Sequence, residues 1–139
     1  MKKLITLWLT TLSIILISSN VFAYDNYDDA DNIVNLARSG YPQAQCDLGK
    51  IYLHGDEYIA MDLEKAAFWI KKSADKGNPD AQNQLGNMYQ HSLYFKKNID
   101  TAIYWYEKSA KQGYAWAQLS LGDLYYNVKK NYMLSAYWY

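Results

Sequence analysis

The sequence has little cysteine, proline or arginine. Its 139 residues include one Cys, two Pro and a single arginine, Arg38. One thiol, Cys46, cannot form an internal disulfide, so the fold must be held together by a packed core. A nucleic-acid-binding protein needs a basic face with arginines that grip phosphates. A formal net charge of zero and scattered lysines exclude that class.

Only one long hydrophobic run is present, and it lies at the N-terminus. Lys2 and Lys3 precede apolar residues 4–17, and Val21-Phe22-Ala23 follows with the small residues that a signal peptidase reads. This pattern predicts a signal peptide over residues 1–23, with cleavage after Ala23. The alternative is an uncleaved membrane anchor, although the run is shorter than the roughly 20 residues of a membrane span.

Export to the periplasm or the exterior of a bacterial cell is therefore expected. No Cys follows the cleavage site, which argues against a lipid anchor, and no later segment is apolar enough to cross a bilayer. Without Lys2 and Lys3, 12 basic residues face 14 acidic ones, which leaves a net charge of −2. The 15 Tyr and 5 Trp supply large side chains for a modest core.

A nine-residue motif, Ala-x-x-x-Leu-Gly-x-x-Tyr, occurs three times, at spacings of 37 and 36 residues. Five identities in one frame, counting the Gln after each Ala, do not recur three times by chance, and a fixed period of this length indicates a repeat array. The motif residues are Ala44, Leu48, Gly49 and Tyr52; Ala81, Leu85, Gly86 and Tyr89; and Ala117, Leu121, Gly122 and Tyr125.

A second block follows each motif. Residues 65–77 match residues 101–113, and Ser135 to Tyr139 begin the same block a third time. The predicted organisation is a repeat domain over 24–139, with a half unit at 28–40, repeats at 41–77 and 78–113, and an incomplete repeat at 114–139.

Each block has the periodicity of a helix. The motif residues fall at i, i+4, i+5 and i+8, on one face of a 3.6-residue period. Pro42 and Pro79 suit first helical positions, with Asn78 as an N-cap, and Gly40, Gly77 and Gly113 suit left-handed C-caps. We therefore expect helices at 29–39, 42–54, 62–76, 79–91, 98–112, 115–127 and 131–139.

The motif also has a packing rationale. Its Gly removes a side chain so that the partner helix can approach, and the Tyr three residues later fills the space beside that contact. The small residues Ala66, Ala74, Ala102 and Ala110 would serve the next unit in the same way. Because one helix pair cannot bury its face alone, stacking is expected. The predicted fold is all-α, a solenoid of antiparallel helix pairs.

At these residues the chain resembles the Sel-like repeat (SLR) family, a relative of the tetratricopeptide repeat. The resemblance covers about residues 37–139 and includes both motif halves in order, down to Ala-x-x-Trp-Tyr. The family's Gly-x-Gly after the first helix is reduced to Gly55, and the paired cysteines of some bacterial members are absent. The resemblance implies a tetratricopeptide-like superhelix of about 2.5 repeats that acts as an adaptor or scaffold for proteins or peptides.

One segment matches a catalytic motif. Ser73-Ala-Asp-Lys76 has the Ser-x-x-Lys pattern of penicillin-interacting enzymes, and some exported members of the family have been described as β-lactamases. No Ser-Asp-Asn or Lys-Thr-Gly accompanies it, and a helix end supplies no oxyanion hole. We therefore expect no catalytic residues, and a β-lactamase-like hydrolase is the weakest hypothesis.

Metal and cofactor sites are not expected either. His54 and His91 occupy equivalent places about one repeat apart, too far to share a metal without further ligands. Cys46 has no predicted His partner and is interpreted as a packing residue. The acidic run from Asp25 to Asp31 lacks the Gly and Glu of a calcium loop.

Partner binding is assigned to the helix face opposite the motif. At about 100° per residue, the residue after each motif Gly points away from the packed side, and in solenoids of this type the first helices line the concave surface. An ordinary solvated face is the alternative. The predicted groove residues are Lys50, Asn83, Asn87, Gln90, Trp116, Leu119, Asp123 and Tyr126, with Cys46, Leu53, Gln43 and Asp80 beside them.

The last predicted helix is apolar and has no polar cap. Tyr132, Met133 and Tyr137 to Tyr139 would leave an exposed aromatic face. Either the array continues beyond a truncated third unit, which we favour because the motif stops midway, or this end docks onto something, a second copy included.

The sequence as a whole predicts a non-catalytic protein- or peptide-binding adaptor of the bacterial envelope. A periplasmic immunity-type inhibitor of a toxic effector is the alternative.

Overall fold

The computed structural model describes residues 27–139, with side chains from residue 31 onward. The chain divides into two compact units, residues 1–30 and 31–139, and the second is described by itself. The predicted signal peptide, residues 1–23, and the acidic run as far as Ala30 lie outside the side chains described.

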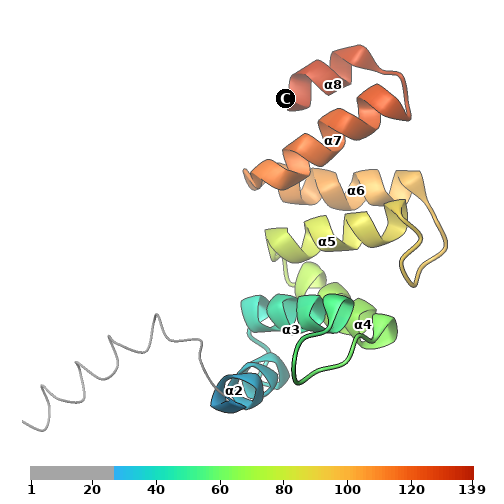
Figure 1. Ribbon diagram of the computed structural model, residues 1–139. Coiled ribbons are helices and arrows are strands. Elements are labelled where there is room, and N and C mark those ends of the chain that lie inside the picture. Colours follow the sequence, from blue (N-terminus) through green and yellow to red (C-terminus); the bar gives the residue numbers. More distant parts are fainter. Residues whose placement is uncertain (1–26) are drawn as a thin grey trace, which may run out of the picture. The chain divides into compact units, whose positions relative to one another are not determined.

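The described chain is all-helical, as predicted, and contains no strand. Every helix end lies within two residues of its predicted place. The elements, labelled in Figure 1, are α2 (Tyr27–Arg38), α3 (Pro42–His54), α4 (Leu63–Asp75), α5 (Pro79–Gln90), α6 (Ile99–Ala110), α7 (Ala115–Asn127) and α8 (Tyr132–Trp138).

Local signals in the sequence start and stop these helices. Asn78 caps α5 by accepting a hydrogen bond from the Ala81 amide at 2.9 Å, and Asp62, Asn98 and Asn131 cap the second helices in the same way. Gly40, Gly77 and Gly113 have φ of 96°, 91° and 84°, which is the left-handed region. These glycines end the helices as predicted.

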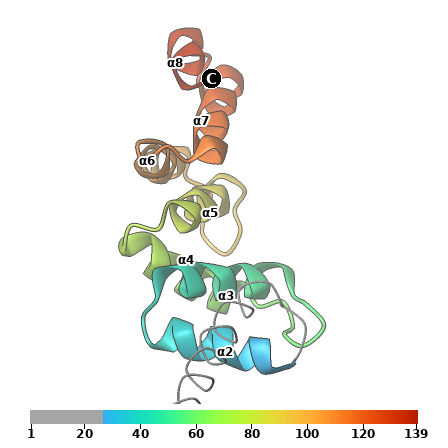
Figure 2. The same cartoon turned by 90° about the vertical axis from the view of Figure 1, so that its left-hand side faces the viewer.

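The helices form three antiparallel hairpins, α3–α4, α5–α6 and α7–α8. They follow one another in chain order along the unit, in the stacked arrangement of a solenoid (Figure 1, Figure 2). A Cβ added at Gly49 or Gly86 would lie 2.6 Å from Ile70 or Tyr106 of the partner helix, and one at Gly122 would lie 2.6 Å from Tyr139, which caps the end of α8. The predicted reason for the motif Gly, close approach of the second helix, is confirmed.

Repeated hydrogen bonds join successive units. The amide nitrogens of Gln45, Gln82 and Gln118 donate to the carbonyls of Ala37, Ala74 and Ala110, each eight residues earlier. Each bond is a second one to a carbonyl at the end of the preceding helix, which also accepts the backbone N–H of the closing glycine. The Gln of the motif therefore ties each first helix to the unit before it.

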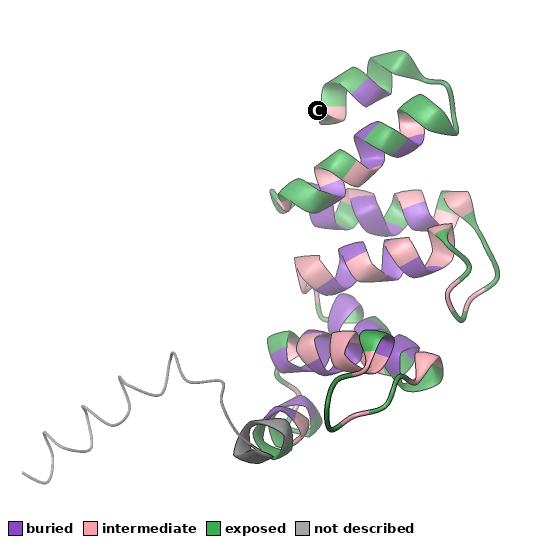
Figure 3. Cartoon of the chain, viewed as in Figure 1, coloured by how far each residue is buried: buried purple, intermediate pink, exposed green. Residues whose placement is uncertain are grey.

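The hydrophobic core extends along the stack of helices as a series of clusters and is not concentrated in one place. The clusters of apolar residues are shared by neighbouring hairpins, so that Ala66 and Ile70 of α4 pack with Leu85 and Met88 of α5. Buried residues accordingly alternate with exposed ones along each helix (Figure 3). Within residues 27–139, no helix has the length and hydropathy needed to cross a membrane.

Candidate partner-binding surface

The predicted groove face is not open along the whole array. Cys46 and Asn83 lie at equivalent places in α3 and α5 and are 0% and 5% exposed, and Leu53 is also buried. The expectation that these residues face solvent is wrong. Cys46 and Leu53 belong to the same cluster as Ala81 of α5, because each first helix packs against the next unit as well as against its own partner helix.

Polar groups of this face join successive units around Asp80. The Lys50 ammonium lies 2.8 Å from the Asp80 carboxylate, and the Tyr114 hydroxyl donates to the same carboxylate at 3.0 Å. Burial alone would raise the pKa of Asp80, but the bond and charge of Lys50 hold it below its usual value. Burial and the neighbouring Asp80 raise the pKa of Tyr114 to about 12. Lys50 and Asp80 thus stabilise the junction between repeats.

Two other predicted groove residues are used inside a hairpin. The hydroxyl of Tyr106 on α6 lies 2.7 Å from both Asn87 Oδ1 and Gln90 Oε1 of α5. In the third unit the Tyr139 hydroxyl donates to Asp123 at 2.6 Å. Asn87 and Asp123 each directly follow a motif Gly, where the tyrosine ring crosses the first helix. These polar side chains therefore bind the tyrosine hydroxyl of their own hairpin.

The face is open on α7. Trp116, Leu119 and Tyr126 are 66%, 44% and 51% exposed, and their spacing places them on one side of the helix. Tyr126 also meets Tyr132 of α8 edge-to-face, with ring centroids 5.3 Å apart. We call Trp116, Leu119, Tyr126 and Tyr132 the α7 surface. It is the only part of the predicted groove that combines several large apolar side chains with exposure.

The second helix of the third unit is also exposed. Met133 and Tyr137 of α8 are 86% and 73% exposed. Tyr139 is 66% exposed, whereas its equivalents Ile70 and Tyr106 are fully buried by the next unit. The predicted aromatic end face is therefore present, and its occupant stays a prediction.

Ser73 has a structural role in the fold. It is fully buried, and its hydroxyl donates to the Pro42 carbonyl at 2.6 Å, as Ser109 does to Pro79. Lys76 donates to the Gly40 carbonyl and does not contact the Ser73 hydroxyl through any hydrogen bond in the described chain. The Ser-x-x-Lys match is thus explained by a contact of Ser73 within the α3–α4 hairpin and a contact of Lys76 with the preceding half unit.

The one cluster of ligand-type atoms in the described chain is Cys46, Asp47 and Asp80, whose atoms lie within 4.8 Å of one another. Burial, and then Asp80, raise the pKa of the Cys46 thiol far above its ordinary value. The thiol therefore stays protonated, and the Asp80 carboxylate is paired with the Lys50 ammonium. His54 and His91 are exposed and do not join this cluster.

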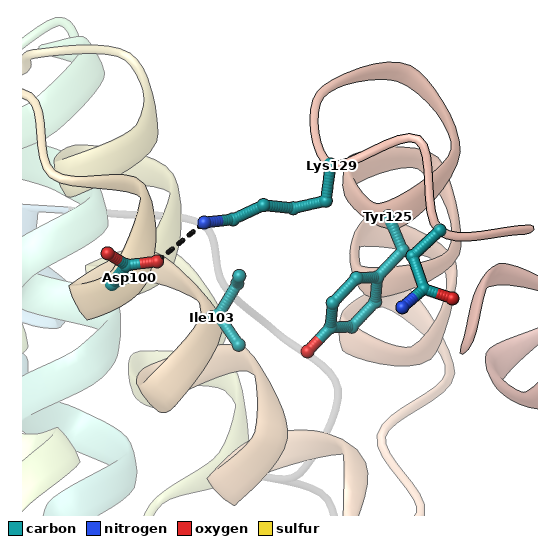
Figure 4. Close-up of a pocket in the computed structure, with 5 residues that line it drawn as sticks. Asp100, Ile103, Tyr125 and Lys129 are labelled. Carbon is teal, nitrogen blue, oxygen red and sulfur yellow. Dashed lines mark hydrogen bonds and ion pairs between the residues drawn. The ribbon is translucent and has the colours of Figure 1, made fainter.

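One feature was missed by sequence reasoning. A pocket of about 440 Å³ opens between α6 and α7 and is lined by Asp100, Ile103, Tyr125, Lys129 and Asn131. Figure 4 shows the side chains of Ile103 and Tyr125 facing the same space, with the 2.7 Å ion pair of Lys129 and Asp100 beside it. The signal was present in the sequence, because the third loop is shorter than the other two.

Known structures with this arrangement are repeat proteins. A Sel1 repeat protein from Oxalobacter formigenes is 28% identical over 85% of this chain and 89% of that one, with a TM-score of 0.75. A protective antigen of uropathogenic Escherichia coli strains, which displays an SLR fold, is 26% identical over 78% of this chain and 31% of that one, with a TM-score of 0.52. No curated protein matches the sequence significantly.

The family assignment comes from the repeats themselves. The family model for the Sel1 repeat matches residues 42–78, 79–114 and 117–139. Sel1 repeats are generally protein–protein interaction units, and no enzyme is among these similar structures. With three matched repeats, a continuous stack of helix hairpins and solved structures of the same kind, the chain belongs to the Sel1 repeat family.

Proposed function

We propose that this chain is a non-catalytic adaptor that binds a protein or peptide partner through the α7 surface. The observation that carries the proposal is the contrast along the array. Two positions that are buried in α3 are exposed in α7, where Leu119 and Tyr126 replace Cys46 and Leu53. Large exposed aromatics beside aliphatic side chains are typical of the anchors of protein interfaces.

The chemistry of this surface favours an apolar partner. Trp116, Leu119 and Tyr126 bear no charge, and Asp123 between them accepts the Tyr139 hydroxyl. An amphipathic helix or an extended peptide with apolar side chains would bury these groups, and polar neighbours such as Ser120 would form the rim. Lys50, Asn83, Asn87 and Gln90 are engaged or buried in the array and are not part of this proposed surface.

The experiment compares capture by matched variants. The purified protein is crosslinked to bacterial envelope extract, and captured proteins are identified by mass spectrometry. Changing Trp116, Leu119 and Tyr126 together to Ser should remove specific partners. Phe68→Ser alters an equally exposed aromatic of α4 and should leave capture unchanged. If the triple variant captured the same partners with unchanged helical circular dichroism, the α7 surface would be rejected.

The place of action is part of the same proposal. The predicted signal peptide would deliver the protein to the periplasm or outside the cell. N-terminal sequencing of the protein from cell fractions should find Tyr24 as the first residue. A tight one-to-one complex with a toxic effector would identify the adaptor as an immunity-type inhibitor, the alternative that the sequence leaves open.

A further inference from the structure

The motif tyrosine of the second unit carries an aromatic side chain on its ring. Phe95, from the loop between α5 and α6, stacks on Tyr89 with ring centroids 4.5 Å apart and an angle of 13° between the planes. Both rings pack against the core cluster, as does Leu93 of the same loop. In the first unit, Ile59 of the loop packs with the motif tyrosine Tyr52 in one cluster. The loops of the first two units therefore each add an apolar side chain to the cluster that holds the motif tyrosine, and in the second unit this side chain stacks on the tyrosine ring.

The loop between α7 and α8 is closed by the same backbone hydrogen bond as the others, but it is too short to place a side chain on its motif tyrosine. The capping residue of each second helix donates its backbone N–H to the carbonyl of the motif tyrosine, Asn98 to Tyr89 at 3.0 Å and Asn131 to Tyr125 at 2.8 Å. In the second unit, residues 90–97 lie between the two residues that this hydrogen bond joins, whereas in the third unit only residues 126–130 do. The shorter loop continues from α7 with Val128, Lys129 and Lys130, and no described ring stacks on Tyr125.

The missing cover leaves a pocket at Tyr125. Its volume of about 440 Å³ is ample for a phenyl ring, since a cavity of roughly 150 Å³ can hold benzene. Ile103 and Tyr125 both pack on the apolar cluster between α6 and α7, so the pocket continues that core to the surface. Lys129 and Asp100 pair at 2.7 Å and cancel each other's charge, which gives the pocket no preference for a small ion.

We propose that this pocket binds one aromatic side chain of the partner peptide, stacked on Tyr125 as Phe95 stacks on Tyr89. The inference rests on the proposed binding function and adds an anchor on the loop side of α7. The chain itself shows the chemistry of the occupant, because an equivalent tyrosine in the preceding unit selects a phenylalanine. The Asp100 side chain, 84% exposed, can accept a hydrogen bond from the N–H groups of the bound peptide.

A small probe tests the pocket without knowledge of the partner. N-acetyl-phenylalaninamide is titrated into the isotope-labelled protein, and chemical shifts are followed by NMR. Saturable shifts are expected at Ile103, Tyr125 and Lys129 with a Kd of about 1 mM, the affinity typical of a ligand of this size. N-acetyl-alaninamide, which lacks the ring, should produce none. If shifts at these residues did not saturate by about 20 mM, the proposal would be overturned.

Two variants sharpen the result. Replacing residues 127–130 by the loop 91–97 should place a Phe on Tyr125, abolish probe binding and raise the melting temperature. Conversely, Phe95→Ala should open the equivalent site and add a second set of saturable shifts around Tyr89. Continued probe binding to the grafted protein at Tyr125 would contradict the proposed stacking.

The outcome is separable from that of the partner-capture experiment. Probe binding with no effect of the α7-surface variant on capture would reject the proposed function but keep the pocket. Loss of capture in that variant without probe binding would do the reverse.

Discussion

The ring of Tyr106 occupies the space that a side chain at Gly86 would need. A Cβ at Gly86 would lie 2.6 Å from two ring carbons of Tyr106, whose hydroxyl reaches on to Asn87. The same crossing recurs in the third unit, where Tyr139 lies over Gly122 and bonds to Asp123. In both hairpins, therefore, the same contact holds the two helices together. A tyrosine ring packs on the motif Gly, and its hydroxyl bonds to the residue after that Gly.

Replacing these glycines should have unequal effects. Gly86→Ala forces the fully buried Tyr106 to move, so it should destabilise the fold by about 1–3 kcal/mol despite the better helix propensity of Ala. Gly122→Ala meets Tyr139, which is exposed and can swing away, so it should be neutral or stabilise by up to about 1 kcal/mol. Urea unfolding followed by circular dichroism measures both variants. If both variants lost the same free energy of unfolding, the freedom of the tyrosine ring to move would not determine the destabilisation.

Ser73 should matter for stability and not for hydrolysis. Ser73→Ala removes the hydrogen bond from the buried Ser73 hydroxyl to the Pro42 carbonyl, which should cost about 0.5–1.5 kcal/mol. Ser120→Ala, which loses only a bond within α7, is the control and should cost less. The purified protein should not turn over nitrocefin. Turnover that disappeared in Ser73→Ala would reinstate the hydrolase hypothesis.

The contacts that Asp80 makes with the neighbouring repeats should weaken at both pH extremes. Because the pKa of Asp80 is lowered by folding, its contribution to stability is present above the ordinary pKa of 3.8 and is lost as pH falls below that value. The pKa of Tyr114 is raised from 10.0 to about 12, so its contribution is present below pH 10.0 and is lost between pH 10.0 and about 12.

Denaturant titrations from pH 2 to 12 measure these two edges. Asp80→Asn should flatten the acid edge, and Tyr114→Phe should flatten the alkaline one. Asp56→Asn, a change of another carboxylate in the loop after α3, serves as the control. An unchanged acid edge in Asp80→Asn would mean that other carboxylates determine it.

The exposed face of α8 should promote self-association. Met133 and Tyr137 are the most exposed large hydrophobic residues of the described chain, and α8 carries no charge. Sedimentation should show a dimer at concentrations of about 100 μM, and Met133→Lys with Tyr137→Lys should restore a monomer. Phe68→Lys, a matched change on α4, should not. A monomeric parent protein would end this prediction.

The sequence alone determined the helices and their pairing. Pro42, Pro79, Asn78 and the closing glycines act on their own backbone, so their effects can be predicted from neighbouring residues. Gly49, Gly86 and Gly122 indicated close helix contact because only a missing side chain explains a glycine repeated within helices. The family resemblance rested on these same positions, and the repeat matches confirmed it.

Only the tertiary structure decided which faces are open. Helical periodicity predicts that Cys46, Asn83 and Leu119, which hold the same place in the motif, lie on the same face of their helices. It does not predict whether the next unit covers them. Stacking buries the first two and leaves Leu119 exposed, which restricts the candidate surface to α7. The pocket at Tyr125 likewise depends on how far each loop reaches after the helices are stacked. Such contacts join residues about one repeat apart, so they follow from the superhelix and not from local backbone preference.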